Sequence, residues 1–378
     1  MKKDNKIALV HDFLTGLGGA ENVLGAIAEV YDKSDVFTLI SDKSILKDTE
    51  FDWIRKKKVT QSFLQKFPKF FRERRKWLLP LMPTAIETLD FRDYDLVISS
   101  SGAFSKGIVV KSKTTHVCYV HSPLRYVWDW HHQYLEENYL KGKTKFFLRF
   151  FLSHLRMWDR ASAMRPDFLI ANSKYTRDRI RKYYRRESEV IYPSVEVGDF
   201  KPTKENQGYF LTVSRLSAYK RVDVLIEAFA KLNLPLVIVG EGAEKKNLQN
   251  KIEELGVSSK IKLVGGVDRE KLIRLYENSR AFVFAAEEDF GIAVVEAMAA
   301  GKPVIALGRG GTAETVQEGK TGEFFEEAKA DLVVEAVKRF LQNEREYDFR
   351  EIRKHAEKFG KERFQRELAS FIKDSIKY

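Results

Sequence analysis

Two glutamates, Glu288 and Glu296, stand eight positions apart in the stretch EEDFGIAVVEAMAAGKPVIA, residues 287–306. The pattern predicts a strand (AFVFAA), a loop and then a helix that ends before Gly301. A helix N-terminus at the end of a strand offers free N–H groups and a positive dipole end, which suits a diphosphate. One carboxylate could accept hydrogen bonds from a sugar ring and the other from a ribose diol. Acidic residues also stabilise helix N-termini without any ligand, and this alternative stays open for Glu288.

Two cations lie near the end of another predicted strand. Arg215 and Lys220 are five residues apart in TVSRLSAYKRVDVLIEAF, after GYFLTV and before an amphipathic helix. Two cations beside a strand end can neutralise a pyrophosphate, and an arginine can bind it through two parallel hydrogen bonds. Solvated loop charges are the alternative interpretation.

The first predicted strand is followed by a glycine-rich loop. Gly16, Gly18 and Gly19 precede a helix that starts near Ala20. Glycines let backbone N–H groups approach a phosphate closely, but such a loop fits any nucleotide-binding fold. Glu21 lies in the first turn of the predicted helix, where a purely structural charge is also common.

His121 ends the predicted strand in CYVHSPLRYVWDW. A lone histidine is more often structural, but a strand end followed by Ser-Pro favours a place in an active site. Arg125 and Asp129 follow it closely, and the tryptophans of the same stretch are interpreted as core residues.

Short β-branched runs alternate with helical patterns along the chain, which predicts βα units and parallel sheets covered on both faces. The pattern restarts near residue 200 after a polar stretch without periodicity. We therefore expect an α/β protein with two doubly wound Rossmann-like domains, whose strand ends meet at a cleft. The expected divisions are an N-terminal domain (1–193), a linker (194–206), a C-terminal domain (207–355) and a final helix crossing back to the first domain (356–378).

The E-x7-E spacing, inside a strand–loop–helix with FG and GKPVI, resembles the retaining GT-B glycosyltransferases of family 4. The resemblance covers almost the whole chain and is strongest from Tyr209 to Thr321. It implies a nucleotide-sugar donor whose hexose contacts Glu288 and whose ribose contacts Glu296. It further implies that Arg215 and Lys220 bind the diphosphate. The other donor-binding residues that it implies are Gly18, Gly19, Asp289, Phe290, Gly291, Ile292, Gly265, Val267 and Leu272.

The stretch HSPLRYVWD resembles mannosyltransferases that build O-antigen and exopolysaccharide on lipid carriers. In these relatives a histidine at the place of His121 contacts the transferred sugar. The resemblance therefore favours mannose, GDP-mannose as donor and a lipid-linked saccharide as acceptor, with Arg125, Asp129 and Glu21 on the acceptor side. UDP-sugars remain open, because no residue separates guanine from uracil, and the linkage and the acceptor's identity stay undetermined.

Transfer from a sugar nucleotide needs charge neutralisation on the leaving diphosphate more than a strong base. The cations Arg215 and Lys220 and the helix N-terminus at Gly291 supply it. The sequence has no His/Cys cluster, so we expect no metal and no cofactor. Without a clear nucleophile, front-face transfer with retention of configuration is favoured, as the resemblance implies. A sugar-nucleotide epimerase of the same architecture is the less favoured enzyme class.

The charge of +12 is uneven, since residues 1–200 hold 35 Lys and Arg against 25 Asp and Glu. Ten Lys/Arg and one Glu fall within residues 55–83, among Phe, Leu and Trp near helical spacing, and residues 141–158 repeat this style. Basic helices with an aromatic face suit an anionic membrane surface, where each cation contributes about 1 kcal/mol. Core helices with a solvated basic face are the alternative.

Other protein classes fit less well. The sequence has no base-stacking or groove-reading module, which argues against a nucleic-acid-binding protein. One cysteine, Cys118, excludes a disulfide framework and indicates a reducing compartment. No apolar run approaches the roughly 18 residues that span a bilayer, and the start lacks an apolar signal segment. We expect a cytoplasmic protein, peripheral on the inner face of the cell membrane.

Overall fold

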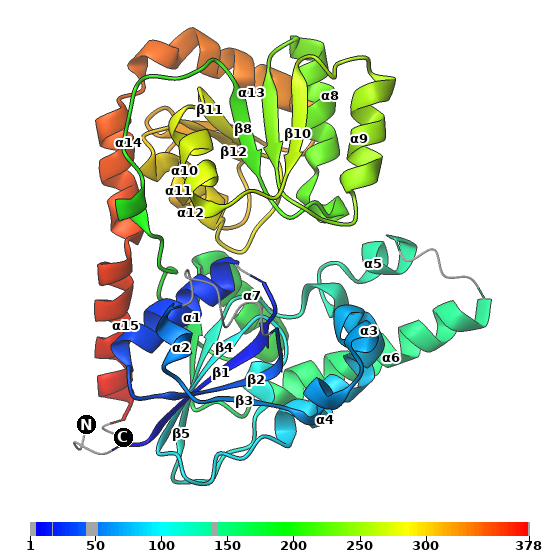
Figure 1. Cartoon of the computed structure of the whole chain (residues 1–378), viewed down its shortest axis with the longest axis vertical. Helices are drawn as coiled ribbons and strands as arrows, with labels where there is room; N and C mark the ends of the chain where they lie inside the picture. The colour runs from blue at the N-terminus through cyan, green and yellow to red at the C-terminus, as the bar shows by residue number, and fades with distance from the viewer. Residues whose placement is uncertain (1–4, 17, 43–51, 138–141, 377–378) are drawn as a thin grey trace. The chain divides into compact units, whose positions relative to one another are not determined.

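The computed structural model describes residues 5–16, 18–42, 52–137 and 142–376 (Figure 1). The chain divides into two compact units. The first unit consists of Met1–Ser194 and Phe364–Tyr378, and the second consists of Val195–Arg363. Each unit is built on its own parallel sheet.

The first unit holds a seven-stranded sheet in the order β3-β2-β1-β4-β5-β6-β7. Its strands are β1 (Ile7–Leu14), β2 (Asp35–Ser41), β3 (Val59–Gln61), β4 (Leu96–Ser101), β5 (Thr115–Val120), β6 (Phe168–Ala171) and β7 (Glu189–Val190). Its helices are α1 (Gly19–Val30), α2 (Asp52–Arg55), α3 (Lys69–Glu73), α4 (Met82–Glu87), α5 (His131–Glu137), α6 (Gly142–Ser162) and α7 (Lys174–Tyr184). Short 3-10 helices are η3 (Phe63–Lys66), η4 (Arg75–Leu81), η5 (Ser105–Gly107) and η6 (Arg125–Val127).

The second unit holds a six-stranded sheet in the order β10-β9-β8-β11-β12-β13. Its strands are β8 (Phe210–Val213), β9 (Leu236–Val239), β10 (Ile261–Gly265), β11 (Ala281–Phe284), β12 (Val304–Leu307) and β13 (Gly322–Phe325). Its helices are α8 (Val222–Leu232), α9 (Lys245–Glu254), α10 (Arg269–Glu277), α11 (Ile292–Ala299), α12 (Thr312–Thr315), α13 (Ala330–Asn343) and α14 (Phe349–Ala356). Short 3-10 helices are η7 (Val197–Asp199), η8 (Ala218–Lys220), η9 (Glu344–Glu346) and η10 (Glu357–Phe359). The two parallel sheets with covering helices are the predicted doubly wound, Rossmann-like architecture, and the α/β fold class is confirmed.

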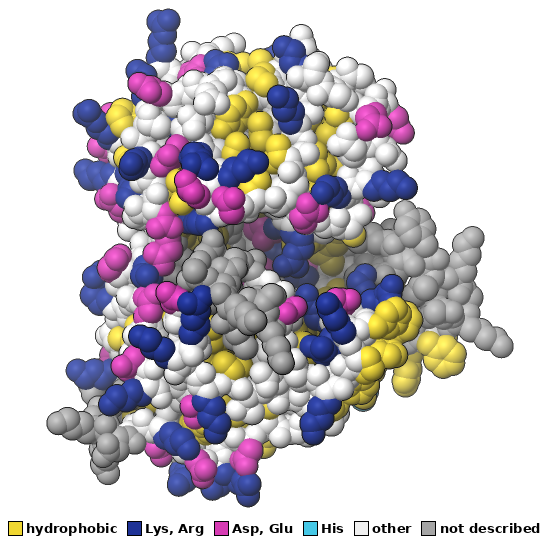
Figure 2. Space-filling view, viewed as in Figure 1, with side chains coloured by type: hydrophobic (Ala, Val, Ile, Leu, Met, Phe, Trp, Pro, Cys, Tyr) yellow, Lys and Arg dark blue, Asp and Glu magenta, His cyan; other side chains and the backbone are white. Residues whose placement is uncertain are grey.

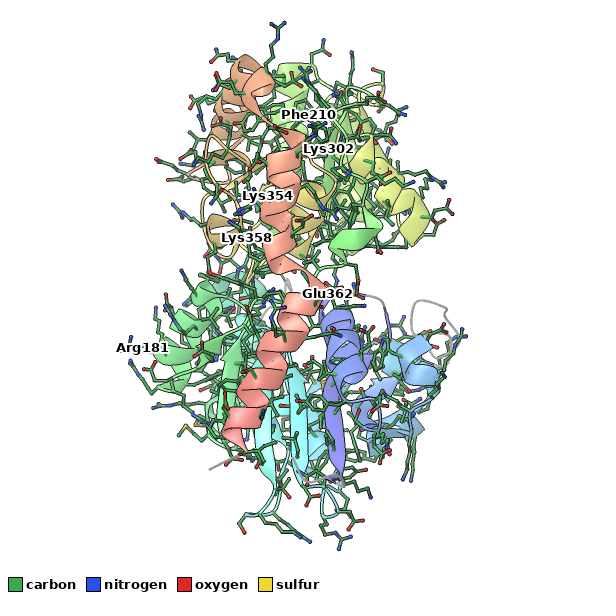
Figure 3. The ribbon with its side chains drawn as sticks, turned by 90° about the vertical axis from the view of Figure 1, so that its left-hand side faces the viewer. Arg181, Phe210, Lys302, Lys354, Lys358 and Glu362 are labelled. Atoms are coloured by element: carbon green, nitrogen blue, oxygen red, sulfur yellow. The ribbon has the colours of Figure 1, made fainter. Side chains whose placement is uncertain are left out.

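The last helix, α15 (Lys361–Ser375), begins in the second unit and continues in the first (Figure 3). Phe364, Leu368 and Ile372 are fully buried in the same core cluster as residues of β1 and α1. The Phe364 ring lies edge-on to Tyr119 of β5, at 5.7 Å between centroids. Burying three large apolar side chains stabilises the docked helix by several kcal/mol, at about 1.5–3 kcal/mol each.

Residues 195–206, which lie in the expected linker (194–206), belong to the second unit and are held there by side chains. The Arg353 guanidinium donates to the carbonyl oxygens of Val197 (2.7 Å) and Phe200 (2.9 Å). The buried Lys302 ammonium, labelled in Figure 3, donates to the carbonyl oxygens of Thr203 (3.0 Å) and Glu205 (2.7 Å). Burial lowers the Lys302 pKa to about 8.

The basic segment 55–83 contains β3, η3, α3, η4 and the first residues of α4. Leu64 and Leu78 are buried in the core, whereas Phe70 and Trp77 are 50% and 62% exposed. Pro68 is the residue before α3, since proline lacks the N–H that would continue a preceding helix, whereas Pro80 lies inside η4.

Candidate functional site

The loop between β11 and α11 carries the first predicted glutamate. Gly291 precedes α11 with φ +89°, a conformation that a side chain disfavours. A second glycine turn buttresses this loop, since the Gly311 N–H donates to the Glu288 carbonyl oxygen at 2.8 Å. A Cβ on Gly311 would lie 2.3 Å from the Phe290 Cα, and one on Gly310 would lie 2.4 Å from the Glu288 carbonyl oxygen. Only glycines permit this approach, which fixes the backbone N–H groups at the helix start.

Lys220 and Glu288, which were predicted separately, meet in an ion pair. Lys220 ends η8 after β8, and Glu288 follows β11, the neighbouring strand. Their side chains are 11% and 19% exposed. The ammonium also lies 5.6 Å from the Phe284 ring centroid. A mostly buried cation and carboxylate therefore lie together beside the start of α11.

Arg215 lies on the same loop as Lys220, with its side chain exposed. Backbone bonds tie this loop to the turn after β9, where the Leu216 N–H donates to the Glu241 carbonyl oxygen at 2.9 Å. A Cβ on Gly242 would lie 2.1 Å from the Leu216 carbonyl oxygen, so this close contact requires a glycine at position 242. The turn after β9 thus supports the loop that carries the two cations.

Both carboxylate oxygens of Glu296 accept hydrogen bonds from other side chains of the protein. Its Oε1 accepts from Arg269 Nη1 at 2.6 Å and its Oε2 from the Tyr276 hydroxyl at 3.1 Å. Arg269 also donates to Asp199 at 3.0 Å. Burial by itself lowers the pKa of Arg269, but the carboxylates of Glu296 and Asp199 have the larger combined effect, so the pKa is raised. The pKa of Tyr276 is raised first by burial and then by Glu296. The sequence analysis missed Arg269, for which the only local signal is its place at the start of a helix.

The turn after β10 carries the residues expected near the nucleobase. Gly265 has φ +76°, and the following Gly266 N–H donates to Glu241 Oε1 at 3.1 Å. Val267 and Leu272 are half-buried. Asp268 caps α10 by accepting from the Lys271 N–H at 2.8 Å. This turn leads directly into the helix that holds Glu296 in place.

In the first unit, His121 belongs to a row of polar side chains. Its Nε2 lies 2.7 Å from Ser100 Oγ, and that hydroxyl lies 3.1 Å from His11 Nδ1. The other His11 nitrogen lies 3.6 Å from Glu21 Oε1. Burial lowers the His11 pKa, but Glu21 and Asp12 outweigh burial, so that the pKa is raised. The structure thus connects predicted His121 and Glu21 through His11 and Ser100, which the sequence analysis missed.

Asp12 was also missed, although a polar His-Asp pair within an otherwise apolar strand is a readable signal. Its carboxylate accepts four backbone N–H groups, from Gly102 (2.7 Å), Ala103 (2.8 Å), Phe104 (2.7 Å) and Ser105 (2.6 Å). Asp12 therefore fixes the loop that follows Ser101 at the end of β4. The predicted Gly18 and Gly19 begin α1 on the same unit, with Gly18 as its N-cap.

Asp129 is held by neighbours of its own unit, as its carboxylate pairs with Arg179 and accepts from the Tyr183 hydroxyl. The Trp128 ring stacks on Tyr183 at 4.5 Å, which supports the interpretation of that tryptophan as a packing residue. Arg125 begins η6 and is half-buried. These contacts show that Asp129 stabilises the packing of its own unit, whether or not it also binds an acceptor.

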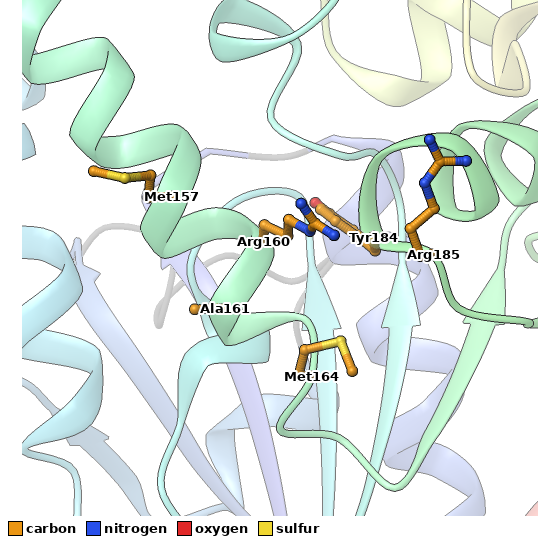
Figure 4. A pocket seen from close by; sticks show the side chains of 6 residues that line it. All are labelled: Met157, Arg160, Ala161, Met164, Tyr184 and Arg185. Carbon is orange, nitrogen blue, oxygen red and sulfur yellow. The ribbon is translucent and has the colours of Figure 1, made fainter.

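A pocket of about 480 Å³ opens on the first unit between α6 and the end of α7 (Figure 4). Its lining combines apolar atoms with two guanidinium groups, from Met157, Arg160, Ala161, Met164, Tyr184 and Arg185. None of the predicted site residues lines it. Over the described ranges, no group of three or more His, Cys, Asp or Glu side chains could hold a metal ion.

Solved structures share the fold. The Anabaena HepE protein in complex with UDP-glucose superposes with a TM-score of 0.73 at 20% identity, over 97% of this chain and 99% of that one. Sucrose-phosphate synthase from Thermosynechococcus elongatus gives a TM-score of 0.75 at 20% identity, over 98% and 99% of the two chains. At this identity the likeness shows the fold alone, which is GT-B.

Curated relatives match parts of the chain. An uncharacterized glycosyltransferase of Methanocaldococcus jannaschii is 32% identical over 153 residues, 39% of this chain and 38% of that protein. A D-inositol 3-phosphate glycosyltransferase of a Mycobacterium species is 28% identical over 177 residues, 41% of this chain and 40% of that protein. A GDP-mannose-dependent alpha-(1-6)-phosphatidylinositol monomannoside mannosyltransferase of Mycolicibacterium smegmatis is 30% identical over 200 residues, 46% of this chain and 52% of that protein. The first two matches thus span about two fifths of the relatives' length.

Two family models match the chain one after the other. Residues 17–198 match the model described as Glycosyltransferase Family 4, and residues 197–363 match the model described as Glycosyl transferases group 1. Together with the two Rossmann-like units and their solved neighbours, these matches support a glycosyltransferase of the GT-B, family 4 type.

Proposed function

We propose that this protein transfers a hexose from a nucleotide-sugar donor to a saccharide acceptor, with retention of configuration and without a metal. The observation that carries the proposal is the Lys220–Glu288 pair beside the N-terminus of α11. A leaving diphosphate needs positive charge, which the ammonium and the free N–H groups of a helix start supply. When the diphosphate takes the ammonium, the Glu288 carboxylate is released to accept hydrogen bonds from hexose hydroxyl groups.

The ribose of the donor is proposed to bind at Glu296. A carboxylate has about four acceptor positions, so Glu296 can keep Arg269 and Tyr276 and still accept from a diol. The two protein donors then hold the carboxylate in one orientation. Arg215 on its exposed loop completes the diphosphate site, and the turn from Gly265 to Leu272 receives the base. On the first unit, His121 is proposed to contact the transferred sugar, with Glu21, Arg125 and Asp129 on the acceptor side.

GDP-mannose is the proposed donor. The GDP-mannose-dependent relative supports this choice, and the UDP-glucose-bound HepE protein is the reason to keep UDP-sugars as the alternative. Thermal unfolding with GDP or UDP at equal concentration separates the two. A ligand at 100 times its Kd stabilises the folded state by about 2.7 kcal/mol, so the preferred nucleotide raises Tm measurably. A rise with UDP alone would overturn the GDP-mannose assignment.

Product analysis then tests the reaction. Labelled GDP-mannose with a membrane extract as acceptor source should yield an α-linked, mannosidase-sensitive product in EDTA. Conversion of the donor sugar without any acceptor would instead indicate an epimerase. Loss of transfer in EDTA, restored by a divalent cation, would refute the metal-independent mechanism.

The acceptor is proposed to be a lipid-linked saccharide of cell-surface polysaccharide synthesis, reached from the inner face of the membrane. Within the described ranges, no helix is long and apolar enough to cross a bilayer. Hydrophobic side chains gather where α3 and α6 lie (Figure 2). Phe146, Phe147 and Phe150 of α6 are 68%, 67% and 70% exposed, and Phe70 and Trp77 are exposed as well. Exposed aromatics within a basic surface favour an anionic interface.

Vesicle binding tests this surface. The wild type should sediment with phosphatidylglycerol-containing vesicles, and added salt should release it. The double variant Phe147→Ser, Phe150→Ser should lose most of this binding, whereas Leu255→Ser, which removes a 44% exposed side chain of the second unit, should keep it. Equal binding to neutral vesicles at high salt would remove the membrane proposal.

A further inference from the structure

A row of polar side chains runs from Glu21 to His121 in the first unit, with the buried His11 and Ser100 between them. We propose that Glu21, His11 and Ser100 form a positioning row that makes Nε2 of His121 a hydrogen-bond acceptor and so keeps its ring proton on Nδ1. The row uses the ends of three neighbouring strands and the first turn of α1. The effect of this row on sugar transfer rests on the proposed function, whereas the position of the proton on His121 does not depend on that function.

The direction of the hydrogen bonds follows from the atoms that can only accept. His11 Nδ1 lies 3.1 Å from the Ser100 carbonyl oxygen, which has no proton to give. His11 must therefore carry its proton on Nδ1. The same N–H lies 3.1 Å from the Ser100 hydroxyl oxygen and shares its proton between the two oxygens.

The Ser100 hydroxyl is then free to donate in one direction. His11 Nδ1 carries a proton and cannot accept, so of the two recorded partners of the Ser100 hydroxyl only His121 Nε2, at 2.7 Å, can take its proton. A neutral histidine has one N–H and one bare nitrogen, so accepting at Nε2 leaves the proton on Nδ1. The Ser105 hydroxyl, which donates to the Ser100 carbonyl oxygen at 2.9 Å, holds the same strand end in place.

Glu21 secures the far end of the row. Its carboxylate lies 3.6 Å from His11 Nε2, so a second proton on His11 is stabilised as an ion pair. The titratable groups that the structure records around His11 are Glu21 on α1, Asp12 on the same strand and His121 after β5. A doubly protonated His11 also donates from Nδ1, so His11 is a donor to Ser100 in both of its protonation states and never competes with His121 Nε2 for the hydroxyl proton.

The backbone around His121 is fixed independently. Its N–H donates to the Ser101 carbonyl oxygen at 2.8 Å, and its carbonyl oxygen accepts from Asn172 Nδ2 at 2.9 Å. The Tyr119 ring lies edge-on at 5.2 Å. The ring of His121 is thus oriented by packing, and the row selects which of its two nitrogens carries the proton.

Nitrogen-15 NMR of the whole protein labelled at its seven histidines tests the proposal. In the wild type, His121 Nε2 should show the shift of an unprotonated ring nitrogen, and Ser100→Ala should change it to a mixture of the two tautomers. The matched control is Ser99→Ala. Ser99 lies next to Ser100 on β4, and its hydroxyl lies 2.8 Å from Nε2 of a different histidine, His116 on β5. This control should change His116 and leave His121 as it was. If Ser100→Ala does not fold, His11→Asn serves as the second variant.

A protonated Nε2 in the wild type, or an unchanged tautomer in both Ser100→Ala and His11→Asn, would overturn the proposal. In transfer assays, Ser100→Ala should lower kcat about tenfold with the donor KM within threefold. An equal loss in Ser99→Ala would indicate a merely structural role. Failure of the wild type to transfer any sugar would refute the proposed function, whereas the NMR result alone would still decide the protonation pattern.

Discussion

Replacing Lys220 by methionine removes the cation from the Lys220–Glu288 pair but keeps a side chain of similar length. The group is 11% exposed, so little solvent screens it. Two unit charges 4 Å apart interact by about 4 kcal/mol at an effective dielectric constant of 20. If about two thirds of this acts on the leaving diphosphate, the barrier rises by about 2.7 kcal/mol, which is a hundredfold loss of turnover.

The partner variant gives an opposite result for product binding. Glu288→Gln removes the carboxylate that competes for the ammonium, so GDP, which has no hexose, should bind more tightly than to the wild type. Lys220→Met should weaken GDP binding, and both variants should lose at least a hundredfold in kcat. Calorimetric GDP titration and initial rates with GDP-mannose measure these two quantities.

Lys231→Met is the matched control, since Lys231 belongs to the same unit and pairs with Asp331 at 53% and 79% exposure. Exposed pairs of this kind contribute about 0–1 kcal/mol, so kcat and GDP affinity should stay within twofold. Circular dichroism confirms folding in each variant. Near-normal turnover in both Lys220→Met and Glu288→Gln would refute the reasoning, as would weaker GDP binding by both.

Three further predictions concern the supports of the site. Tyr276→Phe removes a hydrogen bond to the Glu296 carboxylate, so the free energy of unfolding measured in urea should fall by about 1.5–3 kcal/mol and the donor KM should rise. An unchanged KM would contradict the proposal that Glu296 binds the donor. Gly311→Ala places a Cβ 2.3 Å from the backbone of the donor loop and should lower both Tm and kcat/KM, whereas Gly198→Ala, with no atom within 4 Å, should change neither. Burial lowers the pKa of His116 to about 3, so the unfolded state binds its proton first. Stability should therefore fall from about pH 6.5 downward by up to about 1.36 kcal/mol per pH unit, and a pH slope unchanged in His116→Gln would contradict this.

The periodicity of the chain was sufficient to predict two parallel sheets, because strands buried on both faces must be apolar throughout. The local spacing around residues 287–301 likewise indicated the turn and helix that carry Glu288 and Glu296. These features depend on neighbours within a few residues, and such neighbours can be read directly from the sequence.

The pairing of functional groups could not be predicted in this way. Lys220 meets Glu288 from 68 positions away because β8 and β11 are adjacent in the sheet. His11 meets Ser100 from 89 positions away because β1 pairs with β4 in a register that places the two residues opposite each other.

The sequence by itself therefore determined the residue types, the local turns and the fold class. Strand order and register are set by how whole elements pack, and only the tertiary structure decided which charged groups are already paired. The sequence alone indicates only that a carboxylate such as Glu296 could bind a ligand. Whether it is also held by an arginine and a tyrosine depends on which helix packs beside it.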